Sequence, residues 1–149
     1  MSDRYYASIR IGGDLPRSQV AGFCRLLGLD HESDVALLQH IEDGRLVHCD
    51  DQAAWGEFCE LESACRDLDL PYVRRSEGYW DCPPQAVFWQ PGMEGPESTV
   101  TDSDGNPLVS MDTLCEVRAA LRSGRMAEAL ALLDETIIVV PETPPFRIL

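Results

Sequence analysis

Residues 4–28 read RYYASIRIGGDLPRSQVAGFCRLLG, and this stretch decides the class of fold. Up to Ile11 it alternates apolar and polar side chains, which is the pattern of a half-buried strand. Gly12 and Gly13 then break the alternation, and Pro16 suits the first turn of a helix. Apolar residues follow at helical spacing: Val20, Phe23, Cys24 and Leu27. The stretch therefore predicts a strand followed by a helix.

The next segment, 35–49, is predicted to form a β-hairpin. Asp43-Gly44 is a favoured pair for a two-residue turn, and Glu42 would face Arg45 across it. A short helix over 34–41 is the alternative prediction for the first half of this segment.

The clearest helical pattern comes after this segment. Asp50 or Asp51 is expected to cap the helix, and its apolar residues recur at steps of four and three: Ala54, Phe58, Leu61, Cys65 and Leu68. Strand-forming residues then occupy 72–76 and 86–90, and Pro91-Gly92 ends the second run.

In order, these elements are strand, helix, hairpin, helix, strand and strand. This is the βαββαβ arrangement of a ferredoxin-like sheet with an appended strand, so the expected class is α+β. At this length a single domain over 1–149 is expected, with the sheet core in 1–91, an acidic loop in 92–109 and a C-terminal helical hairpin and tail in 110–149.

The acidic loop is rich in Gly, Pro, Ser and Thr, which predicts either a long surface loop or a small hairpin with Asp104-Gly105 at its tip. After it, Ser110 is expected to cap one helix, and Gly124 separates this helix from a second one. The two helices are expected to close one side of the sheet.

A short apolar run, 137–140, follows the second helix. It is expected to be either a last strand or a tail tucked into the core. Pro144 and Pro145 argue against further regular structure beyond it.

Acidic residues dominate the composition. The chain has 26 Asp and Glu against 12 basic residues, for a net charge of −14. This charge repels nucleic acid and anionic lipid, so a basic protein surface is the expected partner, with no direct nucleic acid and no membrane. All the basic residues are Arg, and the absence of Lys excludes Schiff-base chemistry and a P-loop lysine. Six cysteines without a signal-peptide pattern predict free thiols and a cytoplasmic protein.

Metal and cofactor motifs are not recognisable. The cysteine spacings do not supply the paired ligands of a structural zinc site. Asp102, Asp104 and Asn106 begin like a calcium loop, but Pro107 and Thr113 stand where that loop requires Gly and Glu. We therefore predict no metal site and no cofactor.

Catalytic residues cannot be chosen from six cysteines and three histidines by spacing alone. His48 and Cys49 are neighbours on a predicted strand, so their side chains point to opposite faces and cannot form a dyad. No catalytic residue is nominated, and the chain is expected not to be an enzyme.

The acidic residues form two groups, and both are predicted to bind a partner. Taking about 100° per residue, Glu57, Glu60 and Asp67 fall in one arc beside the apolar stripe of the predicted helix. With Asp50 and Asp51 they would form an acidic edge of about 25 Å. The second group lies on the 92–109 loop and consists of Glu94, Glu97, Asp102 and Asp104. Trp80 and Asp81, on the loop before the last predicted sheet strand, complete the predicted interface.

Such an edge is complementary to a protein groove lined with Arg and Lys, which is the physical basis of a nucleic-acid mimic. In size and charge the chain resembles small acidic inhibitors encoded by phages and mobile elements, including anti-CRISPR proteins. The resemblance implies a protein that inhibits a larger partner by occupying its nucleic-acid-binding surface. The alternatives are an immunity protein that neutralises a basic nuclease toxin, and a small enzyme with a Cys or His in a cleft. The oligomeric state stays open.

Overall fold

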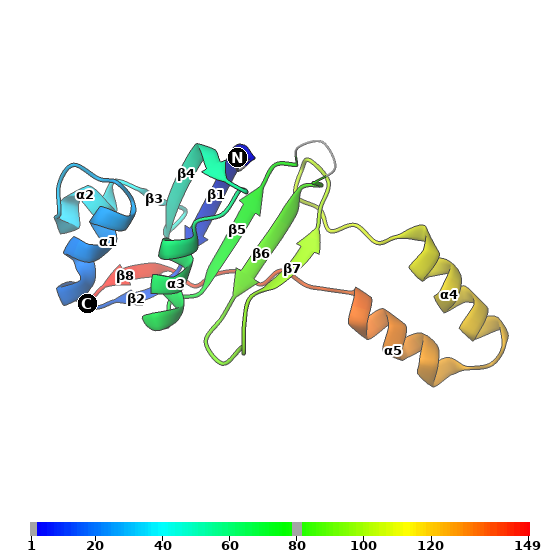
Figure 1. The fold of residues 1–149 in the computed structure, drawn as a ribbon. Helices are drawn as coiled ribbons and strands as arrows, with labels where there is room; N and C mark the ends of the chain where they lie inside the picture. The colour runs from blue at the N-terminus through cyan, green and yellow to red at the C-terminus, as the bar shows by residue number, and fades with distance from the viewer. Residues whose placement is uncertain (1–2, 79–81) are drawn as a thin grey trace.

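The structure is a computed structural model that describes residues 3–78 and 82–149 (Figure 1). Its centre is an antiparallel sheet of six strands in the order β3-β4-β1-β5-β6-β7. These strands are β1 Arg4–Ile11, β3 Ile41–Glu42, β4 Arg45–Ala54, β5 Tyr72–Ser76, β6 Gln85–Trp89 and β7 Glu97–Val100. A separate parallel pair joins β2 Gly13–Leu15 to β8 Phe146–Ile148.

The helices are α1 Val20–Leu26, preceded by the 3-10 turn η1 Arg17–Gln19, then α2 Asp34–Leu38, α3 Cys59–Asp67, α4 Met111–Arg122 and α5 Met126–Thr136. The predicted α+β class is confirmed. Apart from β2 and α2, the elements from β1 to β6 follow the expected chain order, and the ferredoxin-like topology stays a prediction.

The alternation in β1 divides the sheet into two faces. Ala7, Ile9 and Ile11 are fully buried, whereas Arg10 is exposed on the other face. Ile11 has Leu46 of β4 on one side and Tyr72 of β5 on the other, and all three are buried. The inward positions of neighbouring strands therefore form continuous apolar rows.

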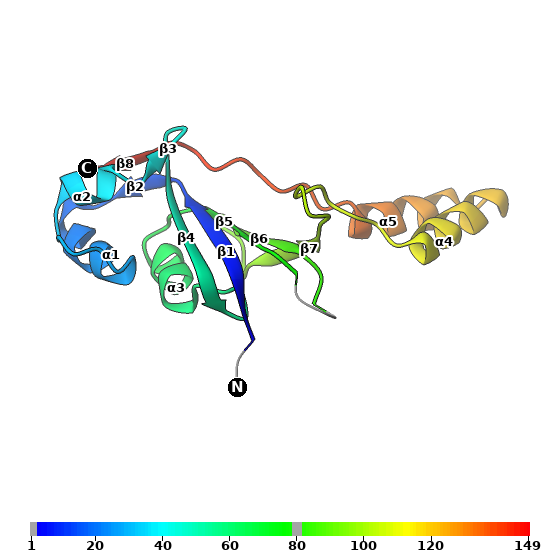
Figure 2. The same ribbon diagram turned by 90° about the horizontal axis from the view of Figure 1, so that it is seen from above.

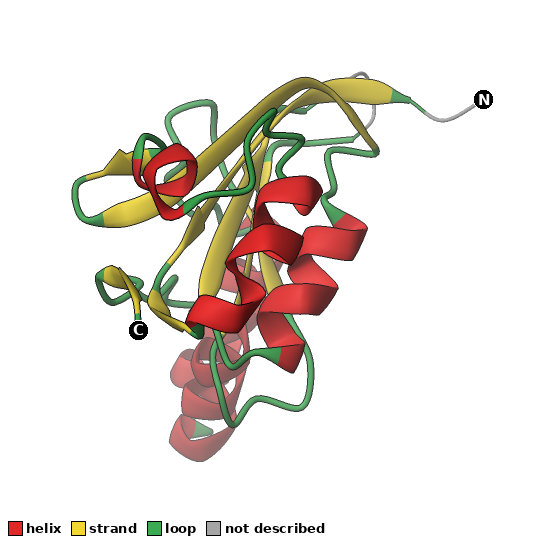
Figure 3. Ribbon diagram, turned by 90° about the vertical axis from the view of Figure 1, so that its left-hand side faces the viewer, coloured by secondary structure: helices red, strands yellow, loops and turns green. Residues whose placement is uncertain are grey.

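Helices α1, α2 and α3 cover this apolar face (Figures 2 and 3). Phe23 and Cys24 of α1 and Leu61 and Cys65 of α3 enter the core as the predicted apolar spacing requires, and α2 adds Leu37. The chain from 137 to 145 runs on the other side of the sheet (Figure 2).

The Asp43-Gly44 turn is present where it was predicted. Both residues have positive φ, as a tight hairpin turn requires, and Glu42 pairs with Arg45 across it. The segment before the turn forms α2, so the short-helix alternative is the correct one for residues 34–38.

The predicted start of the third helix is wrong. Asp50 and Asp51 belong to β4, which pairs with β1 as far as Ala54, and α3 begins only at Cys59. Trp55 and Gly56, both with positive φ, make the turn between them. Continued pairing with β1, which a helix-periodic pattern does not reveal, decided this boundary.

The acidic loop is shorter than predicted, because residues 97–100 form β7 at the edge of the sheet beside β6. The turn at Asp104-Gly105 is present beyond β7, where Thr101 and Pro107 form an isolated bridge. The small-hairpin alternative is thus the correct one for this part of the loop.

The expectations for the C-terminal tail are wrong in two respects. Residues 137–140 form no strand, and Ile137 and Val139 are exposed. Regular structure also resumes after the prolines, because β8 pairs with β2 and the buried ring of Phe146 joins the core. Pro144 and Pro145 lie before the strand, where the missing N–H groups interrupt no ladder.

Helices α4 and α5 form the predicted helical hairpin, but it does not close a side of the sheet. It projects away from the sheet, with one extended connection at each end (Figures 1 and 2). None of the described helices has the length and apolarity needed to cross a membrane.

Candidate functional site

Negative charge gathers at the end of the sheet where β1 begins and β4 and β5 end. Burial raises the pKa of Tyr5, and nearby Cys82, Glu57 and Asp3 act in the same direction. At the next position, the hydrogen bond from Tyr6 to Cys49 and burial raise the pKa of Tyr6 to about 12, with further contributions from Asp51 and Glu77. We define the acidic end as six carboxylates: Asp3, Asp51, Glu57, Glu77, Asp102 and Asp104.

A hollow of about 560 Å³ lies beside Tyr6, on the face of the sheet that α3 does not cover. It is lined by Tyr6, Glu77, Arg75 and the turn that contains Asp102 and Asp104. Arg75 donates to the carbonyl of Gly105 at 3.1 Å, which joins the turn to β5. Three carboxylates from two separate parts of the chain, Glu77, Asp102 and Asp104, therefore line one opening.

Asp102 organises the turn in which it lies. Its Oδ1 accepts from the backbone N–H groups of Asp104 and Asn106, and its Oδ2 accepts from the side chain of Asn106. The hydrogen bonds from Asn106 are the largest cause that lowers the pKa of Asp102. The resemblance to a calcium loop ends here, because the oxygens of Asp102 are used to hold the turn.

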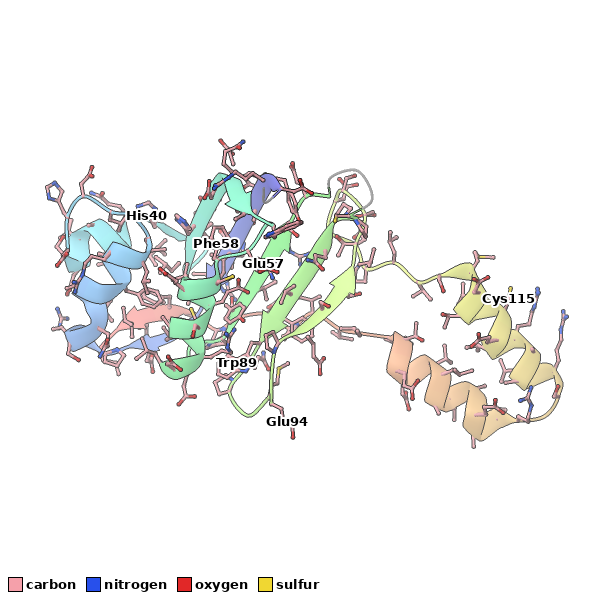
Figure 4. The ribbon with its side chains drawn as sticks, in the orientation of Figure 1. His40, Glu57, Phe58, Trp89, Glu94 and Cys115 are labelled. Atoms are coloured by element: carbon pink, nitrogen blue, oxygen red, sulfur yellow. The ribbon has the colours of Figure 1, made fainter. Side chains whose placement is uncertain are left out.

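The predicted interface residues do not form one surface. Asp51, Glu57, Asp102 and Asp104 are in the acidic end, and Asp50 is adjacent on β4. Glu94 lies in the turn between β6 and β7, at the other end of the sheet from Glu57 (Figure 4). Of the remaining predicted residues, Glu97 begins β7, and Glu60 and Asp67 are exposed on α3. Trp80 and Asp81 lie outside the described residues.

Two members of the acidic end were missed from the sequence. Asp3 comes just before β1, and Glu77 just after β5, where its N–H donates to the carbonyl of Tyr6 at 3.0 Å. The signal that could have found them is the antiparallel pairing of these strands, which brings the start of one to the end of the other.

A buried ion pair was also missed. Arg74 Nε donates to Glu62 Oε1 at 3.0 Å, and Arg74 Nη1 donates to the carbonyl of Gly56 at 2.8 Å. The other oxygen of Glu62 accepts from the N–H of Phe58, which satisfies the start of α3. Glu62 and Arg74 both stand at positions whose side chains point toward the core. Their place within the apolar periodicity of α3 and β5 is the sequence signal that could have indicated a buried pair.

The thiols with a resolved pKa shift are poor nucleophiles. Burial raises the pKa of Cys65, and the hydrogen bond to Glu57 raises the pKa of Cys59. Burial lowers the pKa of His48, which packs edge-on against Phe58 with ring centroids 5.2 Å apart. Within residues 3–78 and 82–149, no three His, Cys, Asp or Glu side chains come together as a metal site.

No protein-family model, no curated protein and no solved structure matches this chain.

Proposed function

We propose that this chain is a non-enzymatic binding protein that inhibits a larger nucleic-acid-binding partner by occupying its basic surface. The observation that carries the proposal is the acidic end: Glu77, Asp102 and Asp104 line one opening. Asp3 and Glu57 lie near Tyr5, and Asp51 lies near Tyr6, at the same end of the sheet. Their charges take the place of phosphates for a groove lined with Arg and Lys.

The carboxylates of the acidic end form no salt bridge among the described residues, although Glu57 accepts from Cys59 and Asp102 accepts within its own turn. Among the described residues, ion pairs engage other carboxylates: Asp14, Glu32, Asp34, Glu62 and Glu128. None of the six carboxylates of the acidic end takes part in these described ion pairs. A basic partner would therefore gain Coulomb energy without having to break an existing salt bridge.

The test compares two variants with equal charge changes. The acidic-end variant carries Glu57→Gln, Glu77→Gln and Asp104→Asn, and its matched control carries Glu60→Gln, Asp67→Asn and Glu94→Gln. Partners are captured on each immobilised protein from nuclease-treated extract of the native host and eluted by a salt gradient. We expect a nucleic-acid-binding protein whose affinity falls by about tenfold or more for the acidic-end variant and changes little for the control.

Duplex DNA added to the captured complex should displace the wild-type chain, because both ligands would occupy one surface. Equal retention of the acidic-end variant and the wild type, or a partner that binds no nucleic acid, would contradict the proposal. A basic nuclease as the captured protein would favour the immunity function over the nucleic-acid mimic of phages or mobile elements.

A further inference from the structure

Exposed apolar side chains are concentrated around the helical hairpin. Among the described residues fourteen large apolar side chains are exposed, and nine of them lie within 108–139. Scattered exposed apolar residues are ordinary, whereas a contiguous group marks an interaction surface. These nine are Leu108, Val109, Met111, Leu114, Leu121, Met126, Leu130, Ile137 and Val139.

The seam between α4 and α5 buries little. Val117, Ala120 and Ala129 are its buried residues, with Leu132 and Leu133 packed beside them. Two of these three are alanines, so the helices approach closely but remove only a small apolar area from water. The hairpin also projects from the sheet and gains no cover from it (Figure 1).

Apolar residues of α5 and of its C-cap form one stripe. Met126 and Leu130 are exposed, Leu133 is half-buried on the side nearer the seam, and Ile137 is the exposed C-cap that follows α5. These four residues recur at steps of four, three and four, so helical geometry places them within about 60° of one another. The stripe is turned by about 70° from Ala129 in the seam, so it lies beside the seam rather than inside it.

On α4, Leu114 and Leu121 are seven residues apart and form a second stripe, turned by about 80° from the seam. Both stripes are offset from the seam in the same rotational sense along their own helix. Because α4 and α5 run in opposite directions, these offsets place both stripes on the same side of the hairpin. We define the apolar side by six residues: Leu114, Leu121, Met126, Leu130, Leu133 and Ile137.

The opposite side of the hairpin is acidic. By the same helical geometry, Asp112 and Glu116 of α4 and Glu128 and Glu135 of α5 point away from the apolar side, and all four are exposed. The hairpin is therefore a single layer of two helices with one face suited to water and one suited to burial. Stable helical structures bury such a face against a second layer.

The charges beside the apolar side are complementary to each other. Arg118 lies on the outer edge of α4, and Asp134 lies at a matching angle, about 130–140° from the seam, on the outer edge of α5. The hairpin also carries only five acidic against three basic residues between 110 and 137, so it holds little of the chain's charge of −14. A second copy of the hairpin would meet weak repulsion and opposite charges at both edges.

We propose that the apolar side binds the apolar side of a second copy of this chain. The two hairpins form an antiparallel four-helix bundle with a two-fold axis along the helices. In this arrangement α4 of each copy lies against α5 of the other. The symmetry makes the contact between Arg118 of one copy and Asp134 of the other occur twice.

The experiment measures the mass of the full chain by sedimentation equilibrium over about a hundredfold range of concentration. We expect a reversible dimer with twice the chain mass of 16.6 kDa. The double variant Leu121→Glu and Leu130→Glu should be monomeric, because it places charge in the centre of the interface. The matched control Glu116→Ala and Glu135→Ala changes the acidic side and should remain a dimer.

A charge exchange tests the two-fold arrangement itself. Arg118→Asp should weaken the dimer by about tenfold or more, and Arg118→Asp combined with Asp134→Arg should restore it. Far-UV circular dichroism and thermal unfolding identify any variant that is misfolded. A monomeric wild type, a dimer that persists in the Leu121 and Leu130 double variant, or a failure of the charge exchange to restore the dimer would overturn the proposal.

Discussion

Glu62 and Arg74 stabilise each other in the interior of the protein, with side chains that are only 7% and 5% exposed. Removing one partner of a buried pair leaves the other charge without compensation. We expect Glu62→Gln to lower the free energy of unfolding by about 3–5 kcal/mol, measured by urea denaturation.

The matched control for this substitution is Glu60→Gln, two residues earlier on the same helix. Glu60 is exposed and forms none of the described ion pairs, so its substitution should change stability by about 0.5 kcal/mol or less. A comparable loss in both variants would show that helix α3, rather than the pair with Arg74, is responsible.

His48 links stability to pH. Burial lowers its pKa below 6.5, the charge of His40 acts in the same direction, and Asp50 opposes them. The unfolded chain therefore takes up the proton first as the pH falls through about 6.5, and stability declines until the pH has passed the folded pKa. We expect the Tm to fall between about pH 7 and pH 5.5.

His48→Gln should remove most of this decline, whereas His31→Gln, at an exposed position, should retain it. The measurement is the Tm of each variant over the same pH series. A decline of equal size in the wild type and in His48→Gln would assign the pH dependence to other groups.

At the scale of elements, the docking of β8 depends on the absence of a side chain at Gly12. A Cβ at this position would lie 2.1 Å from the carbonyl oxygen of Pro144, and backbone atoms there have little freedom to move. Next to it, Gly13 donates its N–H to the carbonyl of Pro145 at 3.1 Å. The tail and β2 are thus in close backbone contact.

We expect Gly12→Ala to displace the tail, expose Phe146 to solvent and lower the Tm. Limited trypsin digestion should then cleave after Arg147 faster than in the wild type, because the bond leaves the β2–β8 pair. Gly22→Ala is the matched control, since a Cβ at this position of α1 meets nothing within 4 Å. Equal cleavage rates in the two variants would contradict the close contact.

At the scale of the whole molecule, the two surfaces proposed to bind, one acidic and one apolar, occupy separate regions. The acidic end lies where β1 begins, and the apolar side belongs to the hairpin that projects beyond β7. A dimer through the hairpin would present two acidic ends, which would raise the apparent affinity for a partner with two basic sites. Monomeric variants should therefore retain the intrinsic affinity of each acidic end and lose only this gain.

Local patterns in the sequence determined the α+β class, the alternation in β1, the Asp43-Gly44 turn and the helical hairpin. Each depends on residues that are neighbours along the chain, where side-chain periodicity and turn preferences act directly. The tertiary structure alone decided that β4 continues through Asp50 and Asp51, because pairing with a distant strand outweighed the helical spacing.

Pairing between distant segments also decided which charges are neighbours. Asp3, Glu57 and Glu77 are far apart in sequence, and the pairing of β1 with β4 and β5 brings them to one end of the sheet near Tyr5 and Tyr6. The composition of α3 does not distinguish Glu62 from the other acids of this helix. The position of β5 beside α3 makes Glu62 the buried partner of Arg74. Composition determined how much negative charge the chain carries, and strand pairing determined where on the molecule that charge gathers.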